Sequence, residues 1–362
     1  METRRIVLGI AVLLIAAAIV YLSNTGAQAD DDAVELSVTD ASQRVREKEQ
    51  RYEKAKELAG ISGYLNTVNL TIGEHIGKNV VLVDFWTYTC INCQRTLPYL
   101  TAWDDKYRDK GLVIIGVHTP EFEFEKKTEN VQNALEKFGI KYPVVQDNDY
   151  ATWRAYNNRY WPRKYLIDID GYIVYDHIGE GGYEETEKKI QNALKERMEV
   201  FGEKGVIGVD FADVEPYTIT TRSPETYFGS LRNSNFGNGG GTGEQQPEIP
   251  PSIKPNTLYL GGRWDIQPEF AENNENGSRI VFHYGAKNVF LVMGADEEVA
   301  VQVLVDGTLV SSEMAGEDVV DGIVTVKEDR LYALIEADEY GEHVLDLVVG
   351  NPGLHAFAFT FG

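Results

Sequence analysis

The sequence predicts an α/β domain followed by an all-β domain, with an apolar membrane or export segment ahead of both. Three observations support this architecture. From about Gly60 to Phe201, short apolar runs alternate with helical patterns. After about Asn256, short β-type runs follow one another and no helix of convincing length occurs. Near the N-terminus, Ile6 to Leu22 form an uninterrupted apolar run.

The apolar run follows two arginines, which predicts that the rest of the chain lies outside the cytoplasm. Residues 1–29 are interpreted as a retained signal anchor, which we favour, or as a signal peptide cleaved near Ala29. The second interpretation rests on Ala27-Gln28-Ala29, which resembles a signal-peptidase site. Residues 30–57 are rich in charged side chains and are expected to form a polar spacer helix.

Residues 58–202 are expected to form the α/β domain. Its predicted strands are Val80 to Trp86, Leu112 to His118, Val144 to Gln146 and Tyr165 to Asp168. Its predicted helices are Gln94 to Lys110, Thr128 to Phe138 and Glu184 to Val200. Strands that alternate with helices are typical of a layered α/β fold.

Residues 203–255 are expected to be a linker with a loop rich in glycine and proline. Residues 256–362 are expected to form a β-sandwich, jelly-roll-like in type. Asp306-Gly307 between two β-type runs predicts a hairpin turn. Four aromatic residues of this domain could form a sugar-stacking platform, although aromatic side chains in such strands belong more often to the core: Tyr259, Trp264, Tyr284 and Tyr332.

The formal net charge of −23 argues against a nucleic-acid partner, because contacts with phosphate require clustered lysine and arginine. We interpret the acidity as a solvated surface that keeps the protein soluble.

The chain has two cysteines, and both lie in Cys90-Ile91-Asn92-Cys93, directly after the first long apolar run. A zinc site is disfavoured because there is no second cysteine pair and the six histidines are scattered without ligand spacing. A purely structural disulfide is disfavoured because so short a loop would remove little chain entropy. The remaining interpretation is a redox pair at a strand-to-helix turn.

The start of a helix suits such a pair, since its unpaired N–H groups and partial positive charge favour the thiolate. Cys90 would attack a disulfide, and Cys93, one turn later, would resolve the mixed disulfide. We expect no metal and no cofactor beyond this redox-active disulfide.

Val83-Asp84-Phe85-Trp86, followed by the cysteine pair and by Pro98, resembles the thioredoxin superfamily. The resemblance implies that Pro162, after Trp161, is the cis proline that faces the cysteines. It also implies that Asp84 is the buried carboxylate behind Cys93. We expect Asp84 to assist proton transfer and Trp161 to offer main-chain groups to an extended substrate.

The match is closer to DipZ-type proteins, which are membrane thiol-disulfide proteins related to cytochrome c biogenesis factors. It is carried by Phe85 to Pro98, Asn158 to Pro162, Leu260 to Trp264 and Ala356 to Gly362. In that family the second domain is similar to carbohydrate-binding modules. DipZ-type proteins carry a multi-helix electron-conducting membrane domain ahead of this region, whereas here a single apolar segment stands there.

These observations predict an extracytoplasmic thiol-disulfide oxidoreductase, with the reductase direction preferred. Its expected partners are protein thiols or disulfides, a separate membrane electron donor, the membrane itself and a glycan on the β domain. Action as an oxidant or isomerase, a surface glycan- or protein-binding module with a vestigial redox domain, and a thiol peroxidase remain as alternatives. Ile91-Asn92 differs from the Gly-Pro of cytosolic thioredoxins, so a thioredoxin-like redox potential does not follow.

Overall fold

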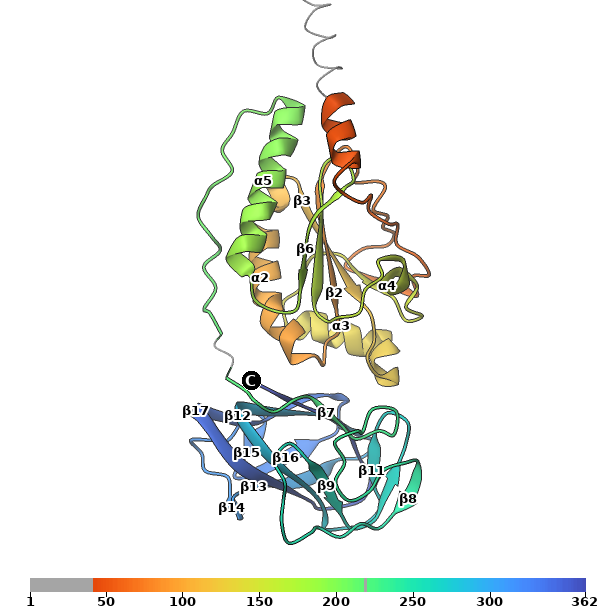
Figure 1. The fold of residues 1–362 in the computed structure, drawn as a ribbon, viewed down its shortest axis with the longest axis vertical. Coiled ribbons are helices and arrows are strands. Elements are labelled where there is room, and N and C mark those ends of the chain that lie inside the picture. Colours follow the sequence, from red (N-terminus) through yellow and green to blue (C-terminus); the bar gives the residue numbers. More distant parts are fainter. Residues whose placement is uncertain (1–41, 218–219) are drawn as a thin grey trace, which may run out of the picture.

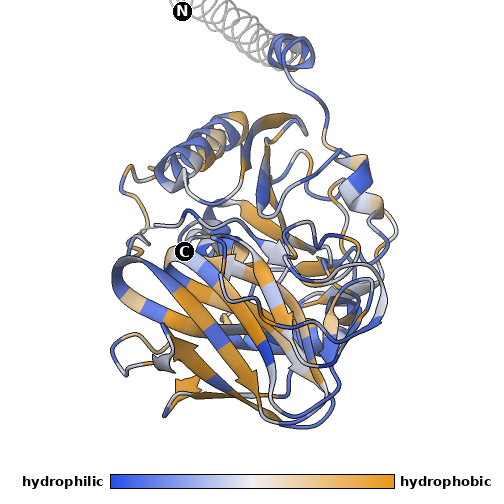
Figure 2. Ribbon diagram, turned by 60° about the horizontal axis from the view of Figure 1, so that its bottom comes forward, coloured by the Kyte–Doolittle hydropathy of each residue, from blue (hydrophilic) through white to orange (hydrophobic). Residues whose placement is uncertain are grey.

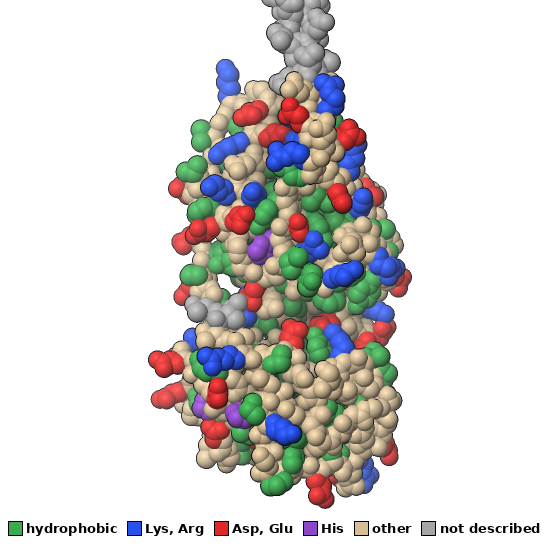
Figure 3. All heavy atoms as spheres, in the orientation of Figure 1, with side chains coloured by type: hydrophobic (Ala, Val, Ile, Leu, Met, Phe, Trp, Pro, Cys, Tyr) green, Lys and Arg blue, Asp and Glu red, His purple; other side chains and the backbone are tan. Residues whose placement is uncertain are grey.

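A computed structural model describes residues 42–217 and 220–362, which form two domains stacked end to end (Figure 1). The apolar run near the N-terminus lies outside the described residues. Within the described part of the chain, no helix is long and apolar enough to cross a membrane. Acidic and basic side chains are scattered over both domains on the face in Figure 3.

The first domain is built on a six-stranded mixed sheet with the strand order β1-β4-β3-β2-β5-β6. The strands are β1 (Gly63–Leu65), β2 (Val80–Trp86), β3 (Leu112–His118), β4 (Val144–Gln146), β5 (Arg163–Ile167) and β6 (Ile173–Ile178). The helices are α2 (Ile91–Tyr107), α3 (Thr128–Lys137), α4 (Ala151–Ala155) and α5 (Tyr183–Phe201), with short 3-10 turns at Arg108–Lys110 and Glu123–Lys126.

The central strand β2 reads Val-Val-Leu-Val-Asp-Phe-Trp, and all seven residues are buried. Both of its faces are covered, which explains the continuous apolar run. Alternate residues such as Leu82 pack in a cluster with α2, α3 and α5. Their neighbours, such as Val83, pack in a second cluster that includes Trp153 of α4.

The bounds of β2, β3 and β4 agree with the predicted ones, and α2 begins three residues earlier than predicted. Ahead of the sheet, residues 42–49 of the expected spacer are helical. Lys48 of this helix is buried against the first domain, where its Nζ lies 2.6 Å from Asp168, 2.8 Å from Asp170 and 2.5 Å from Glu196.

After α5 the chain runs back along the first domain as far as residue 217 (Figure 1). This linker is held to the domain by Glu187 of α5, whose Oε2 accepts hydrogen bonds from the Ala212 main-chain N–H at 2.8 Å and from the Trp103 indole at 3.0 Å.

The second domain is all-β in its described residues, with one network of twelve antiparallel strands. They are β7 (Thr226–Tyr227), β8 (Gly243–Gln245), β9 (Leu258–Gly261), β10 (Trp264–Ile266), β11 (Ala271–Asn273), β12 (Ser278–Ala295), β13 (Val299–Val305), β14 (Thr308–Leu309), β15 (Val319–Val320), β16 (Ile323–Val326), β17 (Arg330–Val349) and β18 (Leu354–Phe361). Bulges interrupt the register of β12 with β17 and with β18. Bulges bend long strands, so the sheet curves around its own core.

The predicted hairpin is present. Asp306 and Gly307 have φ of 52° and 80°, and Val305 pairs with Thr308 across the turn. Two consecutive positive φ values are typical of the tight turn that Asp-Gly favours.

Hydrophobic residues are concentrated along the strands of the second domain (Figure 2). The four aromatic side chains that could have formed a sugar-stacking platform are all buried: Tyr259, Trp264, Tyr284 and Tyr332. They therefore belong to the core and offer no exposed stacking surface.

Candidate functional site

The two cysteines lie where the chain leaves β2 and enters α2. Cys90 is the N-cap residue of α2 and is half-buried, whereas Cys93 is 1% exposed in the first turn. Both are free thiols in this structure. Burial raises the pKa of the Cys93 thiol, and its hydrogen bond with Cys90 raises it further. The outer sulfur is thus accessible and the inner one is protected.

The loop before β5 lies beside the cysteines. Its Trp161-Pro162 peptide bond is cis, and the antiparallel register pairs Arg163 with Phe85 at the end of β2. The Trp161 indole donates to the Thr119 carbonyl at 3.1 Å and packs against the Trp153 ring, with centroids 4.3 Å apart. Trp161 is half-buried and lines the same cleft as Cys90.

Asp84 lies on β2 below the cysteine pair and is 1% exposed. Among the described residues neither of its carboxylate oxygens has a hydrogen-bond partner. Burial raises the pKa of Asp84 to about 7, and the Lys164 ammonium opposes that rise. Lys164 is its cross-strand partner on β5, and burial lowers the pKa of this lysine. A carboxyl group with this pKa can exchange a proton near neutral pH.

The loop between β2 and Cys90 is anchored by a second buried carboxylate, Glu125. Its Oε1 accepts the Thr89 hydroxyl at 2.5 Å, and its Oε2 accepts the main-chain N–H groups of Glu121 and Phe122. Burial raises the pKa of Glu125 to about 7. This carboxylate fixes the residue next to Cys90.

His118 is fully buried at the end of β3, where burial lowers its pKa to about 3. Its ring stacks on Tyr88 with centroids 5.7 Å apart and meets the edge of Trp86 at 5.3 Å. The imidazole is therefore neutral at physiological pH and supports the loop by packing.

Cys90 opens into a cleft of about 530 Å³ between the two domains. The first domain contributes Cys90, Asn92, Glu121, Arg159, Tyr160, Trp161 and Glu180. The linker and the β domain contribute Thr221, Ser223, Glu225, Tyr227, Arg232, Thr360 and Phe361. The cysteine pair therefore faces a wall that its own domain does not supply.

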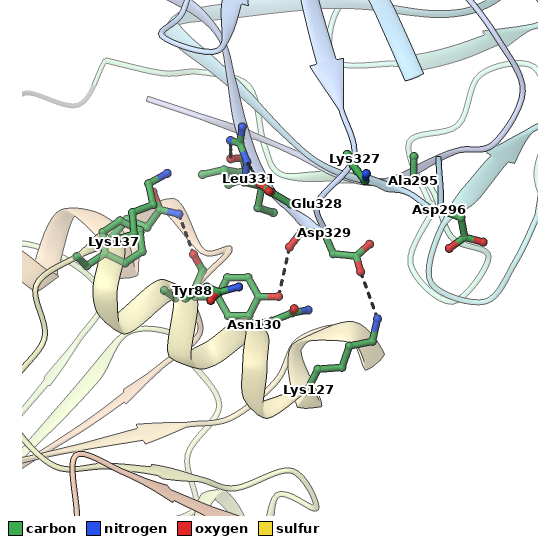
Figure 4. A pocket seen from close by; sticks show the side chains of 15 residues that line it. Tyr88, Lys127, Asn130, Lys137, Ala295, Asp296, Lys327, Glu328, Asp329 and Leu331 are labelled. Atoms are coloured by element: carbon green, nitrogen blue, oxygen red, sulfur yellow. Dashed lines mark hydrogen bonds and ion pairs between the residues drawn. The ribbon is translucent and has the colours of Figure 1, made fainter. Parts of the chain in front are cut away.

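A second interdomain cavity, of about 390 Å³, lies behind the active-site loop (Figure 4). There the Tyr88 hydroxyl donates to the Asp329 carbonyl at 3.3 Å, and Lys127 Nζ lies 3.6 Å from the Asp329 carboxylate. Gln94 of α2 also lines this cavity and donates to the Tyr88 carbonyl at 2.7 Å. The two cavities flank the active-site loop.

The described residues contain one carboxylate cluster with metal-ligand spacing: Asp168, Asp170 and Glu196. Lys48 Nζ occupies its centre, as described above, and it lies apart from the residues of the cleft. The cysteines are not part of this cluster.

The structure brings four of the five expected site residues, namely Cys90, Cys93, Trp161 and Pro162, to one end of the first sheet. The fifth, Asp84, lies behind Cys93. Sequence reasoning missed Lys164, which directly precedes the predicted strand Tyr165 to Asp168 and lies inside the observed β5. It also missed Glu125 and the β-domain wall, for which only the three-dimensional contacts give a signal.

Two known families match this chain. The Redoxin family matches residues 37–194, and a family described as a thioredoxin-like C-terminal domain matches residues 223–362. Protein DipZ of Mycobacterium tuberculosis is 36% identical over 313 residues, which cover 85% of this chain and 43% of DipZ. The chain thus spans less than half the length of this relative.

Thiol-disulfide oxidoreductase YkuV of Bacillus subtilis is 29% identical over 140 residues, which cover 39% of this chain and 93% of YkuV. Among solved structures, a thioredoxin-like protein in its oxidized form has a TM-score of 0.38 and 28% sequence identity. That similarity covers 40% of this chain and 97% of the other one.

Proposed function

The chain belongs to the thioredoxin superfamily of redox enzymes, and from that premise we propose that it exchanges electrons with protein disulfides outside the cytoplasm, preferentially as a reductase. The observation that carries this proposal is the pairing of a half-buried Cys90 at the start of α2 with a buried Cys93 one turn later.

In the reducing direction, the Cys90 thiolate attacks one sulfur of the client disulfide. The client's second sulfur leaves as a thiolate and takes up a proton. Cys93 then attacks Cys90 Sγ, which forms the Cys90–Cys93 disulfide and releases the client's first sulfur as a thiol. Two electrons pass to the client, and no cofactor other than this disulfide is required.

Cys93 must lose its proton before it can attack, and its burial disfavours the thiolate. Asp84 is the proposed acceptor of that proton, since its own pKa lies near neutrality. Lys164 positions this step by favouring the ionised carboxylate. In the oxidising direction the same groups return the proton.

Reduction of the protein itself is assigned to a separate membrane electron donor. We place the catalytic domain outside the cytoplasm, held by the N-terminal apolar segment as an anchor or released by cleavage near Ala29. The preference for reduction follows the resemblance to DipZ-type proteins, in which a membrane carrier supplies electrons. The curved β network is proposed to be a jelly-roll-like sandwich, similar to carbohydrate-binding modules.

Insulin reduction with dithiothreitol as the electron source tests the activity. The wild-type protein is expected to accelerate precipitation of the insulin chains, and Cys90→Ser is expected to abolish the acceleration. If the variant matches the wild type, the protein is not an oxidoreductase and a binding role with a vestigial redox domain is left. Formation of a sulfenic acid on Cys90 with hydrogen peroxide, followed by turnover, would instead favour a thiol peroxidase.

Cys93→Ser identifies the clients. This variant can form the mixed disulfide through Cys90 but cannot resolve it, so clients are expected to stay covalently attached. Non-reducing electrophoresis followed by mass spectrometry reads them out, and the double variant Cys90→Ser/Cys93→Ser is the matched control.

A further inference from the structure

The geometry of the cleft points to a restriction on the clients, which rests on the proposed oxidoreductase function. We propose that the β domain acts as a fixed wall of the active site and admits disulfides in extended, unfolded segments of polypeptide, while it excludes those on the surface of folded proteins.

The wall is fixed because the two domains share one hydrophobic cluster. Phe357 of β18 packs against Phe122 and Phe124 of the first domain, with ring centroids 5.1 and 4.7 Å apart. Phe290 and Leu331 of the β domain belong to the same buried cluster as Leu97 and the other side chains of α2. Closely packed interiors resist opening, so the domains are expected to move together.

Polar contacts across the interface also hold the two domains together. Arg232 Nη1 lies 2.7 Å from Glu121 Oε1, and the Tyr227 hydroxyl donates to the same oxygen at 3.0 Å. Arg232 also lies over the Tyr227 ring, 3.8 Å from its centroid. These residues fix β7 and the loop after it directly beside the cleft that contains Cys90.

The cleft is small for a protein-binding site. Its volume of about 530 Å³ lies in the range of small-molecule pockets, which is about 300–1,000 Å³. A folded protein presents a convex surface, and a specific protein interface needs about 800 Å² on each partner. Only a narrow segment of chain can therefore bring a sulfur to Cys90 past Tyr227 and Thr360.

The lining suits a main chain better than an apolar surface. Glu225 on the β-domain wall shares the single proton of the Tyr227 hydroxyl with Glu121, and Arg159 on the facing wall has no side-chain partner among the described residues. In the same part of the structure, the main-chain N–H and C=O of Trp161 have no hydrogen-bond partner. An extended segment can satisfy such groups, as in strand addition.

The experiment compares two probes with the same reacting group. One is a small globular protein whose single surface cysteine carries 5-thio-2-nitrobenzoate, and the other is the same polypeptide with substitutions that keep it unfolded. Release of the coloured thiol by pre-reduced wild-type protein is measured in single turnover. Each rate is divided by that of dithiothreitol on the same probe, which corrects for the accessibility of the cysteine.

We expect the corrected rate with the unfolded probe to exceed that with the folded probe at least tenfold. YkuV, whose length the match covers almost completely at 93%, serves as the control without the β-domain wall and is expected to treat both probes alike. Equal corrected rates for this protein would overturn the restriction on clients. A failure of the oxidoreductase proposal itself would give another result, because Cys90→Ser would then release the coloured thiol as fast as the wild type from both probes.

Discussion

Lys164 is a fully buried lysine in the strand that follows the cis proline, and its cross-strand neighbour is the equally buried Asp84. Cross-strand neighbours have Cβ atoms about 4.5–5.5 Å apart. Little water screens the two buried groups from each other. Burial raises the pKa of Asp84, and the Lys164 ammonium limits that rise, so the lysine helps to set the pH at which Asp84 can accept a proton.

Removal of the Lys164 charge is expected to shift the pH dependence of catalysis. Without the ammonium, nothing opposes the effect of burial, so the pKa of Asp84 rises above its value of about 7. In Lys164→Met, the rising limb of the kcat/KM profile is expected to move by about 1 to 3 pH units to higher pH.

Lys188→Met is the matched control, since Lys188 is exposed on α5. A purely structural role for Lys164 would lower the rate at every pH and leave the limb in place. An unchanged limb in a folded Lys164→Met protein would therefore contradict the assignment.

Asp84 should also make the stability of the protein depend on pH. Its pKa is about 3.8 when unfolded and about 7 when folded, so the folded state holds this proton more tightly. The contribution of Asp84 to stability is complete below the unfolded value and is lost as the pH rises through the folded value. Between these limits the loss amounts to about 4 kcal/mol at most.

Asp84→Asn should remove this loss. Urea unfolding at about pH 4 and about pH 8 measures it, and the variant is expected to gain stability relative to the wild type at the higher pH. Lys164 loses its neighbouring carboxylate in the variant, which reduces the gain. If the wild type and the variant respond to pH in the same way, Asp84 is not the buried titrating group.

At the residue scale, spacing in the sequence was enough to single out the residues proposed to react. Only two residues separate Cys90 from Cys93, and Pro162 was identified through the resemblance to the thioredoxin superfamily. Lys164 and Glu125 could not be assigned in the same way, because their roles depend on strand register and on a loop that closes over Thr89.

At the level of single elements, the helix at residues 42–49 differs from an exposed spacer. Its polar composition is typical of an exposed spacer, yet Lys48 near its end is surrounded by three carboxylates. The Lys48 ammonium separates charges that would otherwise repel one another. Arg44 of the same helix also bonds to the Asp170 carboxylate at 2.8 Å, so two basic side chains tie the helix to the first domain.

Lys48→Met is expected to weaken the attachment of this helix. The substitution removes the ammonium group from among Asp168, Asp170 and Glu196 and leaves Arg44 paired with the last two, so stability should fall by about 1 to 3 kcal/mol, less than for a fully buried pair because water reaches part of the cluster. Limited proteolysis should then cut the helix sooner.

Arg46→Met is the control for this experiment, because Arg46 is exposed on the same helix. It is expected to change neither the melting temperature nor the rate of cleavage. Equal protease resistance of Lys48→Met and Arg46→Met would show that the lysine does not hold the helix.

In the first domain, the long apolar strands and the helices of at least ten residues were predictable, and most of the short or exposed elements were not. Strands β2 and β3 are buried on both faces, so their sequences define their ends. Strand β6 has no buried residue, and α4 has five residues, so neither leaves a periodic pattern that can be recognised.

For the molecule as a whole, the interface determines whether two domains or one unit unfold. Phe357 also packs against Phe270 of its own domain, with centroids 5.2 Å apart, in addition to its partners across the interface. Because this ring is shared by both domains, the interface should couple their stabilities.

Phe357→Ala is expected to cost about 3 to 5 kcal/mol, as is typical of a large aromatic side chain lost from a core. Calorimetry should show one transition for the wild type and two for the variant. Leu309→Ala, at an exposed position of the β domain, should change stability by about 0.5 kcal/mol or less. A single transition in both variants would contradict the coupling.

The order of the domains could be predicted from the sequence, whereas their packing could not. The apolar residues of β12 and β18 predict buried strands. Their spacing does not show which face packs in the core of the β domain and which packs against the first domain. The structure shows that Phe290 packs against the first domain and that Leu291 lies in the β-domain core.

Strand β18 is the last strand in the chain, yet it lies inside the second sheet, between β12 and β11, and it supplies two residues of the cleft. A ribosome therefore completes the redox domain well before it can complete the site. During synthesis, a nascent molecule would present an uncovered Cys90 until β18 emerges and inserts. If the proposed wall selects the clients, chains that stop before β18 would be the least selective ones.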